Sequence, residues 1–179
     1  MAVEFFTNVD EVFLITESGI EPLKPSTAIV DMMDERIKEL YPQASEALDE
    51  CYAKSELNTP LFKFKRVRRF CKCNFGTLDH TKIDVSDGIF HLEYVSCPLR
   101  GECPYECRIC KPTMNTKLST AEKRVMRLVC DGKSNIEIAD ELYLSPNTVK
   151  RHISTSYIKT NTRNRAEFIK YANDNSIFI

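Results

Sequence analysis

The spacing of hydrophobic residues divides the chain into parts with different expected structures. From residue 118 onward, apolar side chains recur every three or four positions, which is the repeat of amphipathic helices. Between residues 61 and 95, two stretches alternate apolar and polar residues, as half-buried strands do. The pattern predicts an α+β chain with these parts: a mixed, mostly helical N-terminal region (1–60), a small cysteine-rich β-hairpin unit (61–111), a linker (112–117) and an all-α domain of four helices (118–179).

The N-terminal region combines one short strand pattern with two helical stripes. Residues 12–15 read Val-Phe-Leu-Ile, which suits a buried strand and leaves a helix open as the alternative. Ser26 is a candidate N-cap for a first helix, and Pro42 ends that helix and can start the next. We interpret the Met, Leu and Tyr residues of these helices as core rather than as the lining of a ligand pocket.

The middle part is expected to form an antiparallel hairpin. Residues 61–70 begin with alternating apolar and basic side chains, and residues 89–95 alternate again. Residues 76–88, rich in Asp and Thr, suit the loop between the two strands. The basic side chains of the first strand could contact phosphates. We favour the alternative that they form a solvated face or pair with the acidic N-terminal region.

Capping signals set the boundaries of the C-terminal helices. Two capping boxes, each a serine followed three residues later by a glutamate, begin at Ser119 and Ser134. Ser145 then provides an N-cap, and Pro146 occupies the first helical position, where its missing N–H is harmless. Two short helices joined by a tight turn form a helix-turn-helix, whose second helix enters the DNA major groove. The sequence therefore predicts that the helix at 145–159 reads base edges.

Three segments of this part resemble the LuxR-type (GerE-like) DNA-binding domain: residues 132–139 (GKSNIEIA), 144–152 (LSPNTVKRH) and 164–167 (NRAE). The resemblance implies a four-helix domain that binds double-stranded DNA and often dimerises through its last helix. It implies base contacts from Lys150, Arg151 and Ser154. It implies phosphate contacts from Ser134, Asn135, Asn147, Thr148, His152 and Lys159. The chain departs from the family pattern at polar residues late in the reading helix: Thr155, Ser156, Thr160 and Thr162.

The distribution of charge supports a nucleic-acid partner for the C-terminal part only. Residues 1–60 hold 4 Lys and Arg against 13 Asp and Glu, whereas residues 115–179 hold 11 against 7. A basic surface suits phosphates, and an acidic one suits protein, solvent or the chain's own basic part. The first residues lack the basic start of a signal peptide, and no run approaches the ~18 apolar residues of a membrane span. We therefore predict a cytoplasmic protein without a membrane partner.

Six of the eight cysteines fall at the two ends of the expected hairpin. In a reducing compartment, clustered thiols indicate metal or redox chemistry rather than disulfides. Thiolates suit zinc or an iron–sulfur cluster, and zinc is favoured because the spacing does not follow the ferredoxin run. Cys51 and Cys130 lie on helical apolar faces and are interpreted as buried thiols. The predicted zinc ligands are Cys73, Cys97, Cys103 and Cys110, with Cys71 and Cys107 as spares or alternates and His80 and His91 as alternative fourth ligands.

Together these features predict a DNA-binding transcriptional regulator that acts as a homodimer and carries a structural zinc module. One alternative is a sensor in which labile zinc or an iron–sulfur cluster controls DNA binding. Another is a sigma-like factor that docks on RNA polymerase. No phosphate loop, pair of catalytic carboxylates or nucleophile–base set is visible in the sequence, so an enzyme is not expected. The cysteine segment also resembles cysteine-bearing LuxR-type regulators of bacterial and prophage genomes.

Overall fold

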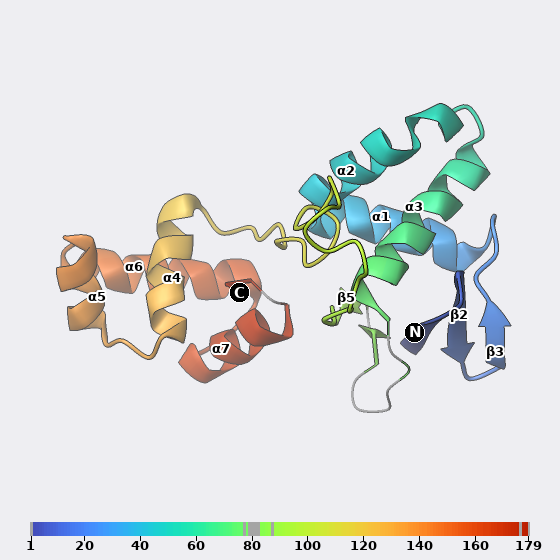
Figure 1. Ribbon diagram of the computed structural model, residues 1–179. Coiled ribbons are helices and arrows are strands. Elements are labelled where there is room, and N and C mark those ends of the chain that lie inside the picture. Colours follow the sequence, from blue (N-terminus) through green and yellow to red (C-terminus); the bar gives the residue numbers. More distant parts are fainter. Residues whose placement is uncertain (1, 77, 79–82, 87, 176, 179) are drawn as a thin grey trace. The chain divides into compact units, whose positions relative to one another are not determined.

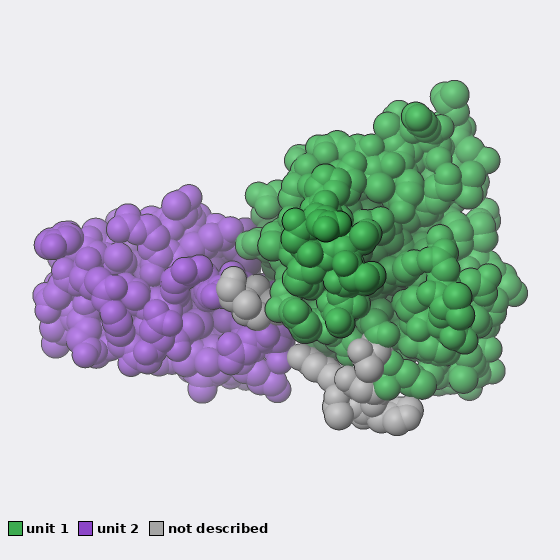
Figure 2. Space-filling view, viewed as in Figure 1, with its two compact units in different colours: residues 1–115 green, residues 116–179 purple. Residues whose placement is uncertain are grey.

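The computed structural model describes residues 2–76, 78, 83–86, 88–175 and 177–178. The chain divides into two compact units, unit 1 at residues 1–115 and unit 2 at residues 116–179 (Figures 1 and 2). The predicted linker spans the boundary between them. Within the described ranges, no helix is both long and apolar enough to cross a membrane.

An antiparallel sheet of five strands forms one layer of unit 1. Its strands, in order across the sheet, are β3 (Gly19–Pro22), β2 (Glu11–Thr16), β1 (Ala2–Asn8), β4 (Val85–Ser86) and β5 (Ile89–Phe90). The register pairs Phe5 with Leu14 and Val3 with Val85. Side chains opposite each other in antiparallel strands point to the same face, and these are buried. One face of the sheet therefore belongs to the core.

Three helices provide the other layer of unit 1. They are α1 (Ala28–Leu40), α2 (Pro42–Tyr52) and, after the short 3-10 helix η1 (Ala53–Ser55), α3 (Thr59–Asn74). The three helices pack on one another, and α3 also packs on β1 and β2. As predicted, Pro42 starts α2 at a position where its missing N–H leaves no intrahelical bond unmade.

Aromatic rings join the sheet to the helices. Phe70 and Phe75, at the end of α3, meet Phe5 of β1, Phe90 of β5 and Tyr41 between α1 and α2. The ring centroids of neighbouring pairs lie 5.6 to 6.1 Å apart. Rings at these separations attract one another by about 0.5–1.5 kcal/mol per pair beyond the burial of their area. This cluster is the centre of the core of unit 1.

The predicted hairpin at 61–95 is wrong in its first strand, because residues 61–70 lie inside α3. Buried positions recur from Val67 to Phe70, Cys71 and Asn74, which is the stripe of a helix. Asn58 caps this helix by accepting a hydrogen bond from a backbone N–H of its first turn. These signals outweigh the short alternation near residue 61.

Three further expectations for unit 1 need correction. The N-cap of α1 is Thr27 rather than Ser26, and its side chain makes no capping hydrogen bond. The second predicted strand is confined to Ile89–Phe90. The N-terminal region contributes three strands in its first 22 residues and is not mostly helical there. Its strands pair with a segment that follows α3, so no boundary between compact units falls at residue 61.

Unit 2 is a bundle of four helices, in agreement with the predicted all-α domain. They are α4 (Thr120–Cys130), α5 (Asn135–Leu142), α6 (Pro146–Thr160) and α7 (Arg165–Asp174). Helix α6 packs on α4 and α5, and α7 packs on α4. Every helix contributes to the fully buried core, which includes Val125, Ile138, Val149 and Phe168.

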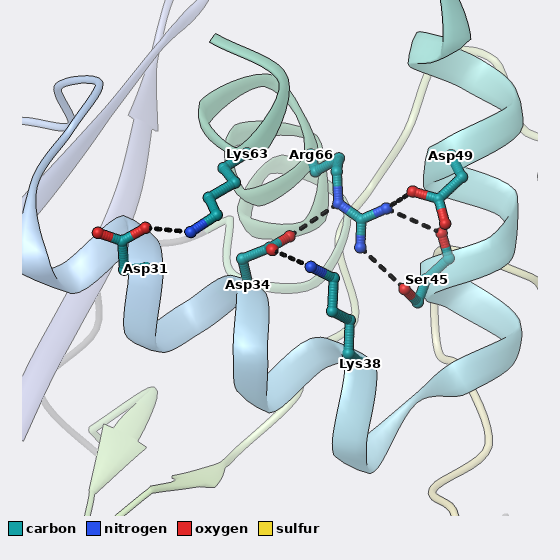
Figure 3. A network of polar contacts seen from close by, with 7 residues as sticks. All are labelled: Asp31, Asp34, Lys38, Ser45, Asp49, Lys63 and Arg66. Carbon is teal, nitrogen blue, oxygen red and sulfur yellow. Dashed lines mark hydrogen bonds and ion pairs between the residues drawn. The ribbon is translucent and has the colours of Figure 1, made fainter. Parts of the chain in front are cut away.

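A buried ion pair joins the three helices of unit 1 (Figure 3). Arg66 of α3 and Asp34 of α1 are both fully buried, and Arg66 Nε donates to Asp34 Oδ1 at 2.7 Å. The other nitrogens of Arg66 donate to the hydroxyl of Ser45 on α2 at 2.8 Å and to its carbonyl oxygen at 3.2 Å. Asp49 of α2 pairs with the same guanidinium, and Lys38 donates to Asp34 at 2.6 Å. One side chain thus ties α3 to both neighbouring helices.

We expect Asp34→Ala to destabilise unit 1 by about 3–5 kcal/mol, because it leaves a buried guanidinium without its main partner. The measurement is the free energy of unfolding in urea. Asp31→Ala is the matched control, since the Asp31–Lys63 pair on the same two helices, at 2.6 Å, is solvent-accessible. The control should change stability little. Equal losses in the two variants would contradict the role given to Arg66.

Candidate nucleic-acid interface

The starts of α4 and α5 are fixed by the two predicted capping boxes, and both are confirmed. Ser134 Oγ accepts from the backbone N–H of Glu137 at 3.3 Å, and the Glu137 carboxylate accepts from Ser134 N–H at 2.7 Å. Ser119 and Glu122 make the same reciprocal pair, at 3.3 and 2.7 Å. The first backbone donors of both helices are therefore satisfied.

A tight turn connects α5 to α6. Tyr143 ends α5 in the left-handed conformation, with φ 54° and ψ 45°. Leu144 N–H then donates to the carbonyl oxygen of Ala139 at 2.9 Å, which closes the turn. Ser145 caps α6 by accepting from Thr148 N–H at 3.1 Å, as predicted. The turn sets the direction in which α6 leaves α5, as a helix-turn-helix requires.

The first half of α6 presents a polar and basic face. Val149 and Ile153 are buried against the bundle. The exposed residues of this half include Asn147, Lys150, Arg151 and Ser154, whereas Thr148 and His152 are half-buried. Within the described part of the chain, neither Lys150 nor Arg151 has an ion-pair or hydrogen-bond partner. Two cations on the outer face of α6 are therefore available to a ligand.

The remaining predicted phosphate contacts differ in their surroundings. Ser134 is exposed and Asn135 half-buried, and both lie at the N-terminus of α5, where helix dipoles favour anions. Lys159, near the end of α6, is already paired. Its Nζ donates to both carboxylate oxygens of Glu122, at 2.9 and 2.7 Å. The residue predicted as a phosphate contact thus also links α6 to the start of α4.

The pair has an electrostatic consequence for Glu122, which is only 5% exposed. Burial alone would raise the pKa of this carboxyl group, but hydrogen bonds from Lys159 and Ser119 hold its pKa below the usual 4.5. Sequence reasoning identified Glu122 as a capping residue and missed its partner. Lys159 lies 37 residues away, and no local pattern joins the two.

Two of the four polar residues that depart from the family pattern bond to the backbone of α6. Ser156 Oγ donates to the carbonyl oxygen of His152 at 2.7 Å. Thr160 Oγ1 donates to the carbonyl oxygen of Ser156 at 2.8 Å. Bonds to the carbonyl four residues earlier satisfy hydroxyls without a partner on another helix. The end of α6 is therefore buried without unpaired hydroxyls at these two positions.

The apolar side chains of α7, the helix through which the family often dimerises, face mainly inward. Phe168 is fully buried and packs in a tilted arrangement against Tyr157 and Tyr171, with ring centroids 6.2 and 6.1 Å away. Ala172 is also buried, and Ile169 is half-buried. Most of these side chains therefore belong to the domain's own core, and the homodimer stays a prediction.

Seven of the eight cysteines lie in unit 1, Cys130 lies in unit 2, and none of the eight forms a disulfide. Four of them line one cavity, and they are the predicted zinc ligands Cys73, Cys97, Cys103 and Cys110. Cys71 is fully buried, and burial raises the pKa of its thiol well above the ordinary value. Cys107 is exposed. Cys51 and Cys130, interpreted from sequence as buried thiols, are half-buried.

His91, one of the two histidines considered as fourth ligands, does not join this group. His91 Nε2 lies 3.1 Å from Ser86 Oγ, and His91 is not among the residues that line the cavity. His80 falls outside the described residues. Among the residues that are described, no group of three or more His, Cys, Asp and Glu side chains is arranged so that it could hold a metal ion. Zinc therefore stays a prediction.

The comparison with family models concerns unit 2. The family model of bacterial regulatory proteins of the luxR family (GerE) matches residues 116–172. The probable transcriptional regulator ycf29 of Cyanophora paradoxa is 45% identical over 56 residues, which are 31% of this chain and 27% of that protein.

Two enterobacterial proteins are also similar. They are the CsgBAC operon transcriptional regulatory protein of Escherichia coli (strain K12) and the probable csgAB operon transcriptional regulatory protein of Salmonella typhimurium. Each is 33% identical over an alignment of 89 residues, which covers 43% of this chain and 41% of the relative. The chain thus spans less than half the length of these relatives. No solved structure matches the chain significantly. Residues 116–172 form a helix-turn-helix domain of the luxR family of bacterial regulatory proteins.

Proposed function

We propose that the chain is a transcriptional regulator that binds double-stranded DNA by inserting α6 into the major groove. The observation that carries the proposal is the pair of exposed cations, Lys150 and Arg151, in the first turns of a helix whose direction is set by a helix-turn-helix turn. Neither cation has an ion-pair or hydrogen-bond partner within the described part of the chain. The family of unit 2 and the names of its relatives support the same reading.

In this proposal the residues divide into those that read bases and those that hold phosphates. Lys150 and Arg151 donate to base edges, where guanine offers two acceptors to a cation, and Ser154 lies beside them. Phosphates are held at the N-termini of α5 and α6. The residues assigned to phosphates are Ser134, Asn135, Asn147, Thr148, His152 and Lys159.

Further parts of the proposal concern partners. A homodimer would read two half-sites, one per copy. Docking on RNA polymerase, as a sigma-like factor would, is an alternative mode of regulation. Binding to DNA is consistent with the predicted cytoplasmic location. It is also consistent with a regulatory role rather than an enzymatic one. The structural zinc module and the metal- or redox-sensor alternatives concern unit 1 and are independent of the DNA contacts.

We expect Arg151→Ala to weaken binding to the specific site by about 1–3 kcal/mol and to relax sequence preference, because a base-reading donor is lost. The measurement is fluorescence anisotropy with an operator selected from random-sequence DNA. Lys170→Ala, which removes an exposed lysine of α7, is the control and should leave preference unchanged. Unchanged binding by the Lys150→Ala/Arg151→Ala double variant would overturn the assignment of α6.

We expect Lys159→Ala to weaken binding to all sequences alike and to lower the slope of log K against log salt by about 1, as loss of a phosphate contact does. Glu122→Gln separates this role from the structural one, because it breaks the ion pair and leaves Lys159 in place. If Lys159 holds a phosphate, Glu122→Gln keeps the salt slope. An unchanged slope in Lys159→Ala would show that Lys159 serves only the ion pair.

The same pair predicts a pH dependence of stability. The folded pKa of Glu122 is lowered, so the stabilisation from this pair is present above the ordinary pKa of 4.5 and is lost as the pH falls through the folded value. The midpoint temperature of thermal unfolding should therefore fall more for the wild-type chain than for Glu122→Gln between pH 6 and about pH 3. An equal loss of thermal stability in the wild-type chain and in Glu122→Gln would argue against a stabilising role of the Lys159–Glu122 pair.

We expect the chain to be dimeric on DNA that carries two half-sites. Multi-angle light scattering of the free chain and of its complex with one or two half-sites measures the stoichiometry. Two chains on the double site and one on the single site would support the homodimer. A monomer both free and on the double site would rule it out.

A further inference from the structure

Unit 2 carries a second group of unpartnered cations, on α4. Lys123, Arg124 and Arg127 lie close together in this helix, and the two arginines are exposed while Lys123 is half-buried. In the part of the chain that the structure describes, none of the three side chains has an ion-pair or hydrogen-bond partner. The contacts proposed for α6 involve Lys150 and Arg151 and leave the cations of α4 without a ligand.

The helical repeat places these three cations on the side of α4 that faces away from the bundle. The buried side of α4 includes Val125, Met126, Leu128 and Val129. At 3.6 residues per turn, positions 123, 124 and 127 fall within about 100° of one another, roughly opposite that buried side. The other exposed side chains of the helix are the small residues Thr120 and Ala121. We call Lys123, Arg124 and Arg127 the basic face of α4.

Folding of the domain does not explain this grouping of charge. Arg127 follows Arg124 by three residues and Lys123 by four, and like charges at these spacings destabilise a helix. The helix dipole favours a cation in the last turn, where Arg127 lies, but not at the two earlier positions. Asp131 follows Arg127 by four residues, yet the two described side chains form no ion pair. The charges therefore stay available to an external anion.

The basic residues of α3 in unit 1 show the opposite arrangement. Lys63, Arg68 and Lys72 each pair with an aspartate, Lys63 with Asp31 and the other two with Asp10. A basic helix in this chain is thus neutralised internally in unit 1. In the DNA-binding unit, the cations of α4 are left free.

An aromatic ring restricts the position of one of these cations. The guanidinium carbon of Arg127 lies over the ring of Phe178, 5.8 Å from its centroid. This contact attracts the positive charge without using the N–H groups of the guanidinium in ordinary hydrogen bonds. Arg127 can therefore donate to an acceptor from a side chain that is already partly ordered, which lowers the entropy cost of binding.

The basic face of α4 and the DNA-reading face of α6 lie on opposite sides of unit 2. Helix α4 crosses α6 and packs on it (Figure 1). Val125 of α4 and Val149 of α6 are both buried in the bundle, so the exposed faces of the two helices point away from each other. Packed helices lie about 8–10 Å apart and each is about 10–12 Å wide, so roughly 20 Å separate the two faces. A straight duplex bound to α6 does not reach the cations of α4.

The composition of the basic face favours a polyanion over a protein as its ligand. Stable protein interfaces have an apolar centre, whereas α4, whose residues are all described, exposes no large apolar side chain. Long cationic side chains without apolar neighbours suit the phosphates of a duplex, which they contact without reading bases.

We propose that Lys123, Arg124 and Arg127 bind the phosphates of a second segment of double-stranded DNA while α6 holds the operator, so that one chain bridges two duplexes. The proposal rests on the DNA binding proposed for α6 and adds to it a site without sequence preference. Because each duplex meets a different helix, operator recognition and bridging can be removed separately.

The test uses the full chain and two duplexes. The selected operator duplex is immobilised and saturated with protein, and capture of a fluorescent duplex of unrelated sequence is measured at several salt concentrations. We expect capture by the wild-type chain. Arg124→Ala/Arg127→Ala should reduce it at least about tenfold near 0.1 M salt and lower the slope of log K against log salt by about 1.8, which is about 0.9 for each lost phosphate contact. Affinity for the operator duplex should stay within about twofold, since α6 is unchanged.

Lys170→Ala, which removes an exposed lysine of α7, is the matched control and should keep full capture. Arg124→Ala/Arg127→Ala should not lower the midpoint temperature of thermal unfolding, because it removes a like-charge contact. Equal capture by this double variant and the wild-type chain would overturn the proposal. That result would also follow if a dimer bridged the duplexes through its two copies of α6, since the variant retains both.

Two other results would overturn the proposal. One is an intact operator complex of the wild-type chain that captures no second duplex. The other is unchanged capture combined with a loss of self-association of the free double variant in light scattering, which would assign α4 to a protein contact. Failure of the α6 assignment is recognised separately, by unchanged operator binding in Lys150→Ala/Arg151→Ala. The comparison of α4 variants can also be made with any immobilised duplex, so it does not require α6 to read sequence.

Discussion

Burial of the Arg66 guanidinium is the constraint on which unit 1 depends. A fully buried cation is tolerated only when its hydrogen bonds are satisfied, and its partners lie on two other helices, at Asp34 and at Ser45. This fixes the rotation of α3 about its axis. With Arg66 turned toward α1 and α2, Phe70 enters the aromatic cluster and Asn74 reaches the segment after β5. The placement of the cysteine cavity follows from that rotation.

The ion pair is better understood as a source of specificity than of net stability. Desolvation of two charges offsets much of their attraction, and an apolar replacement of similar volume can be as stable. A different packing of α3, however, would leave Arg66 buried and unpaired. The helical repeat then places the cysteines of α3 in two different environments. Cys71 lies on the inward face and is an inert thiol, whereas Arg69 and Cys73 lie together, four residues apart, on the face that lines the cavity.

What could be predicted from the sequence was mainly what short-range signals determine. The capping boxes at Ser119 and Ser134 and the proline start at Ser145 depend on residues within one turn, and each is confirmed. Helix α3 was misread as a strand because five alternating residues dominated the reading, while the buried stripe from Val67 to Asn74 carries the packing. The sheet was only partly foreseen, because β1 joins a strand about eighty residues later. The Lys159–Glu122 pair was missed for the same reason of distance.

The Lys159–Glu122 pair also bears on how α6 meets a ligand. It fastens the end of α6 to the start of α4, where Glu122 already closes a capping box. Ser156 and Thr160 bond to backbone carbonyl groups in the same half of the helix, so these two hydroxyls need no partner on a ligand. The first half is different, because Lys150 and Arg151 are exposed side chains on a backbone whose direction is fixed at both ends. Ordering them on a ligand costs side-chain entropy but no rearrangement of the helix. A surface built in this way separates affinity, which resides in the free cations, from orientation, which the buried half of α6 provides.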